Sequence, residues 1–252
     1  MSVRIVIGDV REKLAELPDE SVHCIVTSPP YWGLRDYGVD GQIGLERTVA
    51  EYTATMVEVF RAARRVLRDD GTLWLNLGDS YAGSWGAQGH RVTESDDPAW
   101  HASQIRNNPK RAMQTGTIRD AGLKPKDLIG IPWRVAFALQ ADGWWLRSDV
   151  IWAKPNPMPE SVTDRPTSAH EHVFLLAKSG DTTCWRHRDT RGWALTEPTP
   201  DYIWRNMRTR EESRLVADRL KRNAILIELN PVYAEMARRR IADDAGMFAE
   251  MA

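Results

Sequence analysis

One stretch constrains the fold more than any other, and it reads Thr-Ser-Pro-Pro-Tyr-Trp-Gly over residues 27–33. It follows an apolar run, Val22 to Val26, which has the length and composition of a buried parallel strand. The two prolines exclude both a helix and a paired strand, and they hold the backbone extended. A rigid segment that presents aromatic side chains at the carboxyl end of a strand lies where an open α/β sheet binds its ligand.

The pattern along the chain predicts an α/β fold in which strands alternate with helices. Strands are expected at Val3–Ile7, Val22–Val26, Thr72–Leu77, Trp144–Ala153, Val173–Ala177 and Ala224–Leu229. Helices are expected at Val10–Leu17, Val49–Leu67, Pro132–Ala141 and from Asn230 to about Ile241. The second helix should open with a capping box at Thr48 and Glu51 and be terminated by Asp69-Asp70-Gly71. Two consecutive strands without an intervening helix predict an antiparallel pair at the sheet edge.

Polar side chains follow four of the predicted strands. They are Asp9, Ser28, Asp79 and Glu228. Because the carboxyl ends of parallel strands meet at one edge of a sheet, we expect these residues to share that edge. A terminal carboxylate such as Glu228 can accept hydrogen bonds from both ribose hydroxyls of a nucleoside cofactor, or it can cap the helix that follows.

Composition narrows the class of protein. A chain of 252 residues with a net charge of −1 suits one large domain, and any DNA-binding surface must be a local patch. The two cysteines are far apart, and Cys24 is predicted to be a buried core thiol. The segment His170-Glu171-His172 lacks a third ligand at sensible spacing, so no metal site is expected. Because no apolar run could serve as a signal peptide or membrane span, we expect a cytoplasmic protein.

The motif Ser28-Pro29-Pro30-Tyr31 after a hydrophobic strand resembles the catalytic motif of the DNA amino-methyltransferases, which methylate cytosine N4 or adenine N6. The string from Thr27 to Gly38, and Asp-Gly-Thr-Leu-Trp-Leu-Asn-Leu-Gly-Asp-Ser at 70–80, resemble the permuted subgroup, in which the catalytic half comes first. The resemblance implies a Rossmann-like methyltransferase sheet, mostly parallel with an antiparallel edge strand. It also implies S-adenosyl-L-methionine as cofactor and double-stranded DNA as partner.

The resemblance assigns roles to the motif. Methyl transfer to an exocyclic amine requires the amine lone pair to be freed from ring conjugation, and acceptors that hold the amino hydrogens do this. By resemblance, these acceptors are the Ser28 side chain and the Pro29 carbonyl, while Tyr31 stacks on a flipped base. Cytosine N4 is favoured because the motif begins with Ser28 rather than aspartate, and adenine N6 stays open. The alternative is a proline turn that closes a strand with a packing tyrosine.

The cofactor half matches the family only in part. Residues 227–231, Ile-Glu-Leu-Asn-Pro, resemble its second cofactor motif, which assigns Glu228 to the ribose and Asn230 to the adenine. Asp9 matches a residue that helps hold the adenine, although it could equally cap the helix that follows. The family's glycine-rich loop, aspartate-proline-phenylalanine and Gly-x-Gly, is missing, since residues 193–245 contain no glycine. This departure predicts weak cofactor binding and suggests a second hypothesis, a DNA-binding relic.

Several aromatic and basic residues are candidates for contact with DNA. They are Trp32, Arg35, Arg106, Lys110, Arg111, Arg186 and Arg188. The basic insertion at 82–126 is interpreted as an arm that closes on the DNA backbone, and a solvated insertion is the alternative. Interleaved tryptophans and arginines in 178–210 favour a nucleic-acid surface over a charged linker.

The predicted organisation follows the order of these motifs along the chain. Residues 1–81 form the catalytic part, 82–126 a flexible basic insertion, 127–180 the remainder of the sheet, 181–210 a remnant of the target recognition region, and 211–252 the cofactor-side helix, strand and helix.

Overall fold

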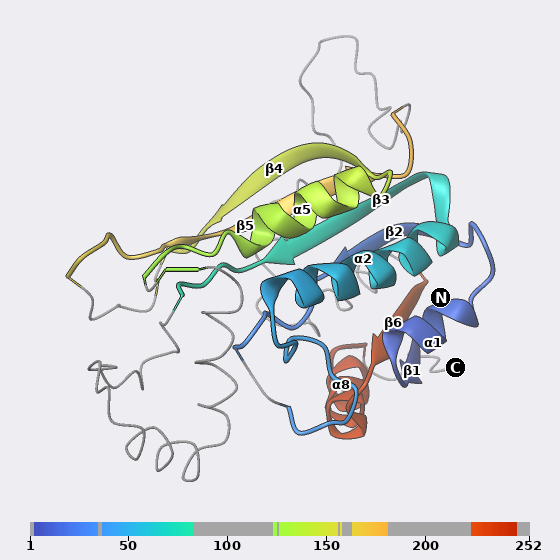
Figure 1. Cartoon of the computed structure of the whole chain (residues 1–252). Coiled ribbons are helices and arrows are strands. Elements are labelled where there is room, and N and C mark those ends of the chain that lie inside the picture. Colours follow the sequence, from blue (N-terminus) through green and yellow to red (C-terminus); the bar gives the residue numbers. More distant parts are fainter. Residues whose placement is uncertain are drawn as a thin grey trace, which may run out of the picture.

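The computed structural model describes residues 3–34, 37–82, 123–124, 126–155, 157, 163–180 and 223–245. Helices and strands alternate through most of this part of the chain (Figure 1). The elements are β1 (Val3–Ile7), α1 (Val10–Ala15), β2 (Val22–Thr27), α2 (Val49–Val66), β3 (Leu67–Leu77), α5 (Ile131–Ala141), β4 (Trp145–Ala153), β5 (His170–Ala177), β6 (Ala224–Glu228) and α8 (Pro231–Ala245). The helices and strands predicted within the described residues are confirmed, with ends that shift by a few residues. A charged helix predicted at Thr209–Arg222 lies outside the described residues.

The described strands form two sheets. The larger has the order β2-β3-β5-β4, and the smaller pairs β1 with β6 in parallel. β2 and β3 are parallel, whereas β5 runs antiparallel to both β3 and β4. The antiparallel pair at the sheet edge is therefore confirmed, and the strand that runs against the others is β5, one place in from the edge.

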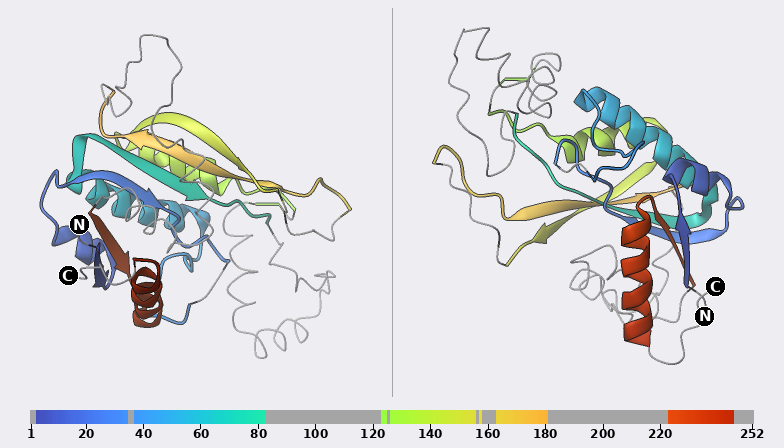
Figure 2. Two further views of the ribbon diagram at one scale, coloured as in Figure 1. Left: turned by 180° about the vertical axis from the view of Figure 1, so that it is seen from behind. Right: turned by 90° about the horizontal axis from the view of Figure 1, so that it is seen from below.

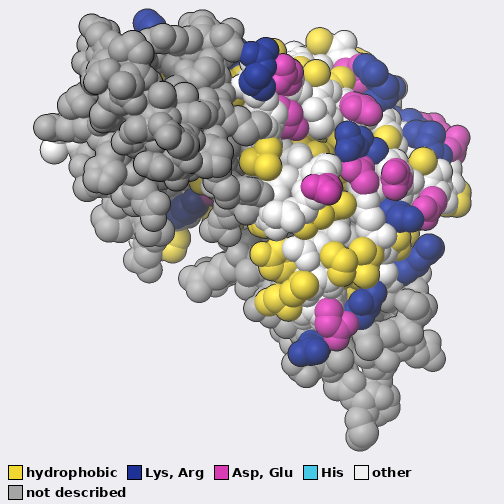
Figure 3. Space-filling model, turned by 60° about the horizontal axis from the view of Figure 1, so that its bottom comes forward, with side chains coloured by type: hydrophobic (Ala, Val, Ile, Leu, Met, Phe, Trp, Pro, Cys, Tyr) yellow, Lys and Arg dark blue, Asp and Glu magenta, His cyan; other side chains and the backbone are white. Residues whose placement is uncertain are grey.

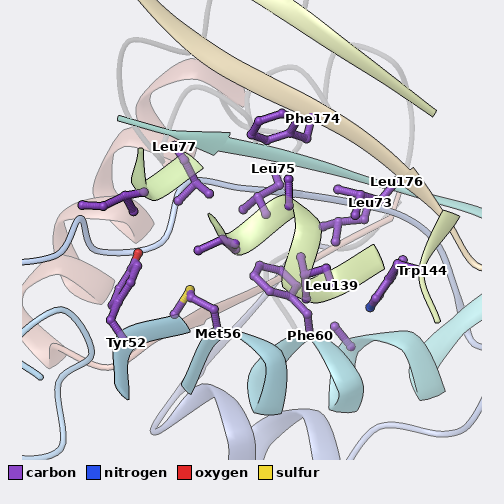
Figure 4. Close-up of a cluster of buried hydrophobic side chains, with 14 of the residues drawn as sticks. Tyr52, Met56, Phe60, Leu73, Leu75, Leu77, Leu139, Trp144, Phe174 and Leu176 are labelled. Atoms are coloured by element: carbon purple, nitrogen blue, oxygen red, sulfur yellow. The ribbon is translucent and has the colours of Figure 1, made fainter. Parts of the chain in front are cut away.

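The core lies between the larger sheet and the two helices that cover one face of it, α2 and α5 (Figures 1 and 2). Leu73, Leu75 and Leu77 alternate along β3, so all three point toward the same face. They meet Tyr52, Met56 and Phe60 of α2 together with Leu139 of α5 and Phe174 and Leu176 of β5 (Figure 4). Ile227 of β6 packs against the same cluster, which ties the smaller sheet to the larger one.

The start of α2 is set locally. The Thr48 hydroxyl accepts a hydrogen bond from the Glu51 amide at 3.1 Å, and the Glu51 carboxylate accepts one from the Thr48 amide at 3.1 Å. This is the predicted capping box, which satisfies two amides that a helix start would otherwise leave unpaired.

The end of α2 differs from the prediction. Asp69, Asp70 and Gly71 were expected to form a terminating turn, but β3 begins at Leu67 and includes all three. Leu67 is fully buried and pairs with Val22, so packing extends the strand back to the helix. Gly71 lets β3 run this close to β2, because a Cβ added at this position would lie only 2.9 Å from the carbonyl oxygen of His23.

Cys24 is exposed, so its prediction as a core thiol was wrong. Successive residues of a strand point to opposite faces, and in β2 the helix-covered face takes Ile25. Cys24 points to the other face, where the Thr72 hydroxyl donates to its sulfur at 3.8 Å. Separately, none of the described helices combines the length and apolar character that a bilayer span requires.

Candidate active site

Three strands bring the candidate site residues together. β2 and β3 are parallel, so their carboxyl ends, with Ser28 and Gly78 just beyond, lie at the same edge of the sheet. β5 is antiparallel to β3, and its first residues therefore lie beside the end of β3, where Leu77 pairs with His172. Figure 1 shows these ends meeting on one side of the molecule.

A hydrogen-bonded group of side chains forms where the strands meet. The Tyr31 hydroxyl lies 2.9 Å from Asn76 Oδ1 and 3.1 Å from Glu171 Oε2. The Ser28 hydroxyl lies 3.2 Å from the same Asn76 oxygen and 3.4 Å from the Tyr31 hydroxyl. Asn76 Nδ2 donates to the His172 carbonyl at 3.3 Å, so the amide oxygen must face the two hydroxyls. Ser28 can therefore donate its single hydrogen to the Asn76 oxygen.

The Tyr31 ring lies close to the backbone at Gly78. A Cβ added at Gly78 would lie 2.4 Å from a ring carbon of Tyr31, which shows how closely the ring approaches. Burial raises the pKa of the Tyr31 phenol well above its usual range, and the nearby Glu171 carboxylate raises it further. Tyr31 is therefore a neutral phenol at physiological pH, as both a stacking ring and a hydrogen-bond donor require.

Helix α2 contacts the proline segment through Tyr52. The Tyr52 hydroxyl donates to the Pro30 carbonyl at 3.0 Å, and burial raises the pKa of this phenol as well. The Gly33 amide donates to the Gly44 carbonyl at 2.8 Å and closes the loop that follows the motif. The motif thus has a fixed backbone, which agrees with the rigidity predicted from its prolines.

Trp32, predicted to contact DNA, is 2% exposed and belongs to the core. Its indole nitrogen donates to the Glu46 carbonyl at 2.8 Å, so both its ring and its polar atom are satisfied inside the protein. The prediction that Trp32 contacts DNA is therefore wrong. The chain turns at Gly33 with the Trp32 side chain pointing inward, whereas the Tyr31 hydroxyl points toward Asn76 and Glu171.

The predicted cofactor-side residues gather at the ends of β1 and β6. Ile7 pairs with Glu228, and the Gly8 amide donates to the Glu228 carbonyl at 3.1 Å. The Glu228 residue is 8% exposed, and its Oε1 accepts from the Asn230 amide at 3.1 Å. Asn230 Oδ1 accepts from the Val232 amide at 2.9 Å, so the Asn230 side chain bonds to the first turn of α8.

Asp9 caps α1, which was the structural alternative proposed for it. Its Oδ1 accepts from the Arg11 amide at 2.8 Å and from Arg11 Nε at 2.9 Å, while Oδ2 accepts from Nη2 at 2.6 Å. Both oxygens are therefore engaged in bonds to Arg11. Its predicted contact with a cofactor adenine stays a prediction.

The loop that follows the motif, described at residues 33–34 and 37–44, lies between the hydrogen-bonded side chains around Tyr31 and the cofactor-side residues at the ends of β1 and β6. The Tyr37 ring lies edge-on to Tyr233 of α8, with centroids 6.2 Å apart. An added Cβ at Gly41 would lie 4.0 Å from Asp9 Oδ2, and one at Gly44 would lie 3.1 Å from the Tyr31 carbonyl. A single loop therefore touches the Tyr31 side, Asp9 and the start of α8, which brings the two groups to one side of the molecule.

Asp79 has a structural task at this edge. Its carboxylate accepts 3.0 Å hydrogen bonds from the Gly130 and Ile131 amides, and so it caps α5 from another element. Burial raises the pKa of the Asp79 carboxyl, and the bonds from the Ile131, Ser80 and Gly130 amides oppose that rise. Asp79, which was predicted to line this edge of the sheet, therefore holds the start of α5 beside the site.

Three further residues join the candidate site in the structure: Asn76, Lys154 and Glu171. Asn76 is a buried amide in the run Leu-Trp-Leu-Asn-Leu, and an isolated polar residue in such a strand is a signal that could have identified it. Glu171 lies in the segment His170-Glu171-His172, which the resemblance to the family places beside the target base. In the described part of the chain, no three His, Cys, Asp or Glu side chains gather as a metal site would need.

The remaining predicted DNA-binding residues lie outside the described residues. They are Arg35, Arg106, Lys110, Arg111, Arg186 and Arg188. On the face shown in Figure 3, the described acidic and basic side chains are interspersed, with hydrophobic side chains among them. The predicted local basic patch therefore stays a prediction.

The family model described as DNA methylase, N6_N4_Mtase, matches residues 22–215, and the chain belongs to this family. Over 172 residues it is 56% identical to the Type II methyltransferase M.Cfr9I of Citrobacter freundii, covering 68% of this chain and 53% of that protein. Over 177 residues it is 54% identical to the Type II methyltransferase M.SmaI of Serratia marcescens, covering 70% and 56%. The chain thus spans about half the length of these curated relatives.

Solved structures confirm the fold class. A putative DNA modification methylase from Thermus thermophilus, complexed with S-adenosyl-L-methionine, has a TM-score of 0.61 at 19% identity, covering 98% of this chain and 97% of that one. The cytosine-N4-specific PvuII DNA methyltransferase has a TM-score of 0.57 at 15% identity, covering 97% and 91%. The protein therefore has the Rossmann-like α/β fold of methyltransferases. Its described strands are mostly parallel, and β5 runs antiparallel to its two neighbours.

Replacing Asp9 with alanine should destabilise the protein by about 1 kcal/mol at neutral pH, because α1 loses its N-cap. The Arg11 side chain holds the pKa of the Asp9 carboxyl below its ordinary value of 3.8. The stabilisation is therefore present above that value and is lost as pH falls through the lowered pKa. Urea unfolding across pH 2–7 should show the difference from wild type shrinking in acid. The exposed Asp40, changed to alanine, is the control and should change the free energy of unfolding little.

Proposed function

We propose that this protein methylates an exocyclic amino group of a flipped base in double-stranded DNA, with S-adenosyl-L-methionine as the methyl donor. The observation that carries the proposal is the inward hydrogen bonding of Ser28 toward Asn76 and Tyr31. A hydroxyl oxygen has two acceptor lone pairs besides its one donor hydrogen, so Ser28 can donate to this group and also accept a hydrogen of the target amine. Membership of the DNA methylase family supports the same reaction.

The proposed chemistry needs no covalent intermediate on the protein. The Ser28 oxygen and the Pro29 carbonyl accept the two amino hydrogens, which turns the amine lone pair out of conjugation with the ring. Tyr31 stacks on the base. When bound, S-adenosyl-L-methionine would supply an electrophilic methyl group and leave as S-adenosyl-L-homocysteine. The methylated nitrogen would then lose one proton to water. Cytosine N4 is the favoured target, and the cytosine-N4-specific PvuII enzyme shares the fold.

The residues at the ends of β1 and β6 fit the nucleoside part of the donor. Glu228 is a nearly buried carboxylate at the end of a strand, a setting that suits two ribose hydroxyls. One of its oxygens already accepts from the Asn230 amide, which fixes the orientation of the carboxylate. Because the catalytic motif precedes the Glu228 motif along the chain, the permuted subgroup accounts for the order of the two halves.

The proposal is tested by incubating the protein with duplex DNA and millimolar donor carrying a labelled methyl group. Mass spectrometry of the digested DNA should then detect N4-methylcytosine. Detection of N6-methyladenine instead would keep the reaction class and change the base. Absence of both products, with folded protein and DNA binding shown in the same sample, would reject the proposed activity.

A DNA-binding relic is the second candidate function. It is favoured by the absence of glycine in residues 193–245, where the family has its glycine-rich cofactor loop. Such a relic would bind duplex DNA through arginines and lysines, so its affinity should fall steeply with salt concentration. Calorimetric titration with S-adenosyl-L-methionine separates the candidates, because a relic would give no binding heat even at millimolar cofactor.

A further inference from the structure

We propose that Glu171 and Lys154 are positioning residues, which hold the Tyr31 hydroxyl in the orientation that methylation requires. This inference rests on the proposed function and assigns a task to a charged pair beside the Ser-Pro-Pro-Tyr motif. Neither residue would touch the target base, and both would act through Tyr31.

The pair is presented by the hairpin of β4 and β5. Glu171 pairs with Trp152 in the sheet, and Lys154 follows the end of β4, where its amide donates to the Ala169 carbonyl at 2.7 Å. The ammonium group of Lys154 forms a salt bridge with Glu171 Oε1. The exposed fractions of the two side chains are 38% for Lys154 and 15% for Glu171. The carboxylate is therefore largely shielded from water, while the ammonium group reaches solvent.

The carboxylate of Glu171 divides its two oxygens between two partners. Oε1 bonds to Lys154, and Oε2 lies 3.1 Å from the Tyr31 hydroxyl. A carboxylate this shielded would be costly beside Tyr31 without a counter-ion, and Lys154 supplies that charge. The salt bridge also fixes the rotation of the carboxylate, so Oε2 is aimed at the phenol.

This arrangement decides where the single hydrogen of the Tyr31 hydroxyl goes. Asn76 Oδ1 and Glu171 Oε2 are both within reach, but hydrogen bonds to charged acceptors are the stronger ones. When Tyr31 donates to Glu171, the Asn76 oxygen is left to the Ser28 hydroxyl. Ser28 then donates its hydrogen to Asn76 Oδ1. Glu171 thus acts on the Ser28 acceptor through Tyr31 and Asn76.

The Tyr31 ring would then be fixed at two points. Gly78 leaves room for the ring only because it has no Cβ, and Glu171 holds the far end of the phenol. A ring held at both points offers a constant plane for stacking, which lowers the cost of ordering it when a base binds.

The same hairpin provides a matched control on its opposite face. His172 Nδ1 lies 3.1 Å from both carboxylate oxygens of Asp149, and this pair sits on the same two strands as Glu171 and Lys154. Adjacent strand residues point to opposite faces, so the His172–Asp149 pair does not face Tyr31. Asp149→Asn therefore tests for general disturbance of the hairpin.

The test uses the full chain with tyrosine labelled by ¹³C at the ring carbon that bears the hydroxyl. Tyr31→Phe identifies the Tyr31 resonance, whose position reports the hydrogen bond of the phenol. We expect Glu171→Gln and Lys154→Met to move this resonance and Asp149→Asn to leave it in place. A resonance that Glu171→Gln does not move, or that Asp149→Asn moves equally, would overturn the proposal.

Methyl transfer at millimolar donor supplies the second measurement. Glu171→Gln should lower kcat by about tenfold, the size of one hydrogen bond to a charged group, with KM for DNA unchanged. In a Tyr31→Phe background the same change should have no further effect, because the hydroxyl it acts through is absent. Equal losses in both backgrounds would overturn the positioning role. A wild-type protein without transfer would count against the proposed function, and the resonances would still decide whether the pair holds Tyr31.

Discussion

Replacing Ser28 with alanine is expected to lower the rate of methyl transfer by about a hundredfold, while the affinity for DNA changes little. The Ser28 oxygen would accept a hydrogen of the target amine, and this bond strengthens as the nitrogen becomes tetrahedral. Removing one preorganised hydrogen-bonding group of this kind costs on the order of 10²–10³ in kcat. The measurement is single-turnover transfer at millimolar donor, together with DNA binding by fluorescence anisotropy.

Ser21→Ala is the matched control for Ser28→Ala. The Ser21 hydroxyl bonds only locally, donating to the Pro18 carbonyl at 2.7 Å, so its loss should leave transfer unchanged. Equal losses of DNA binding and turnover in Ser28→Ala would assign Ser28 a structural task and would falsify the proposed role.

Tyr31→Ala should behave differently from Ser28→Ala. Loss of the ring removes stacking on the flipped base, which is worth about 1–3 kcal/mol, so the affinity for DNA should fall as well as the rate. Tyr31→Phe keeps the ring and removes only the hydroxyl that contacts Asn76 and Glu171. Its DNA affinity should therefore stay near that of wild type while its rate falls, and comparison of the two variants separates stacking from hydrogen bonding.

The parts of the fold that depend on local sequence were predictable. The capping box at Thr48 and Glu51 lies within four consecutive residues, and the alternation of Leu73, Leu75 and Leu77 follows from strand geometry alone. The proline segment could be placed at the end of β2 because two prolines stop a strand wherever it lies.

Features that depend on distant residues were missed. Tyr31 meets Asn76 across 45 positions and Glu171 across 140, and no local pattern encodes either contact. Trp32 was placed outside because aromatic residues beside a motif suggest a binding surface, but the path of the loop to Glu46 decided its burial. The early start of β3 likewise depends on Leu67 pairing with Val22.

The described β1 and β6 pair only with each other, as a sheet separate from β2-β3-β5-β4. Asp9 already bonds to Arg11 with both oxygens, and Glu228 accepts from the Asn230 amide. The described residues therefore offer the Glu228 carboxylate for a ribose, but they do not include the family's aspartate-proline-phenylalanine and Gly-x-Gly loop for the methionine part of the donor.

We therefore expect this 252-residue chain to bind S-adenosyl-L-methionine weakly, with a dissociation constant in the millimolar range, or about −4 kcal/mol. Hydrogen bonds from the ribose hydroxyls to the Glu228 carboxylate contribute a few kcal/mol at most, and binding must also overcome the lost translational freedom of the ligand. Isothermal titration calorimetry measures the constant directly, and Glu228→Gln should weaken it further because the charged acceptor is lost.

Adenosine is the informative control ligand, since it keeps the ribose and lacks the methionine part. If Glu228 provides most of the binding, adenosine and S-adenosyl-L-methionine should bind with affinities within a few fold of each other. A donor affinity in the micromolar range, or methyl transfer to DNA at micromolar donor, would contradict this prediction. It would mean that residues of this chain outside the described part bind the methionine carboxylate and sulfonium, and that the glycine-rich loop of the family can be replaced.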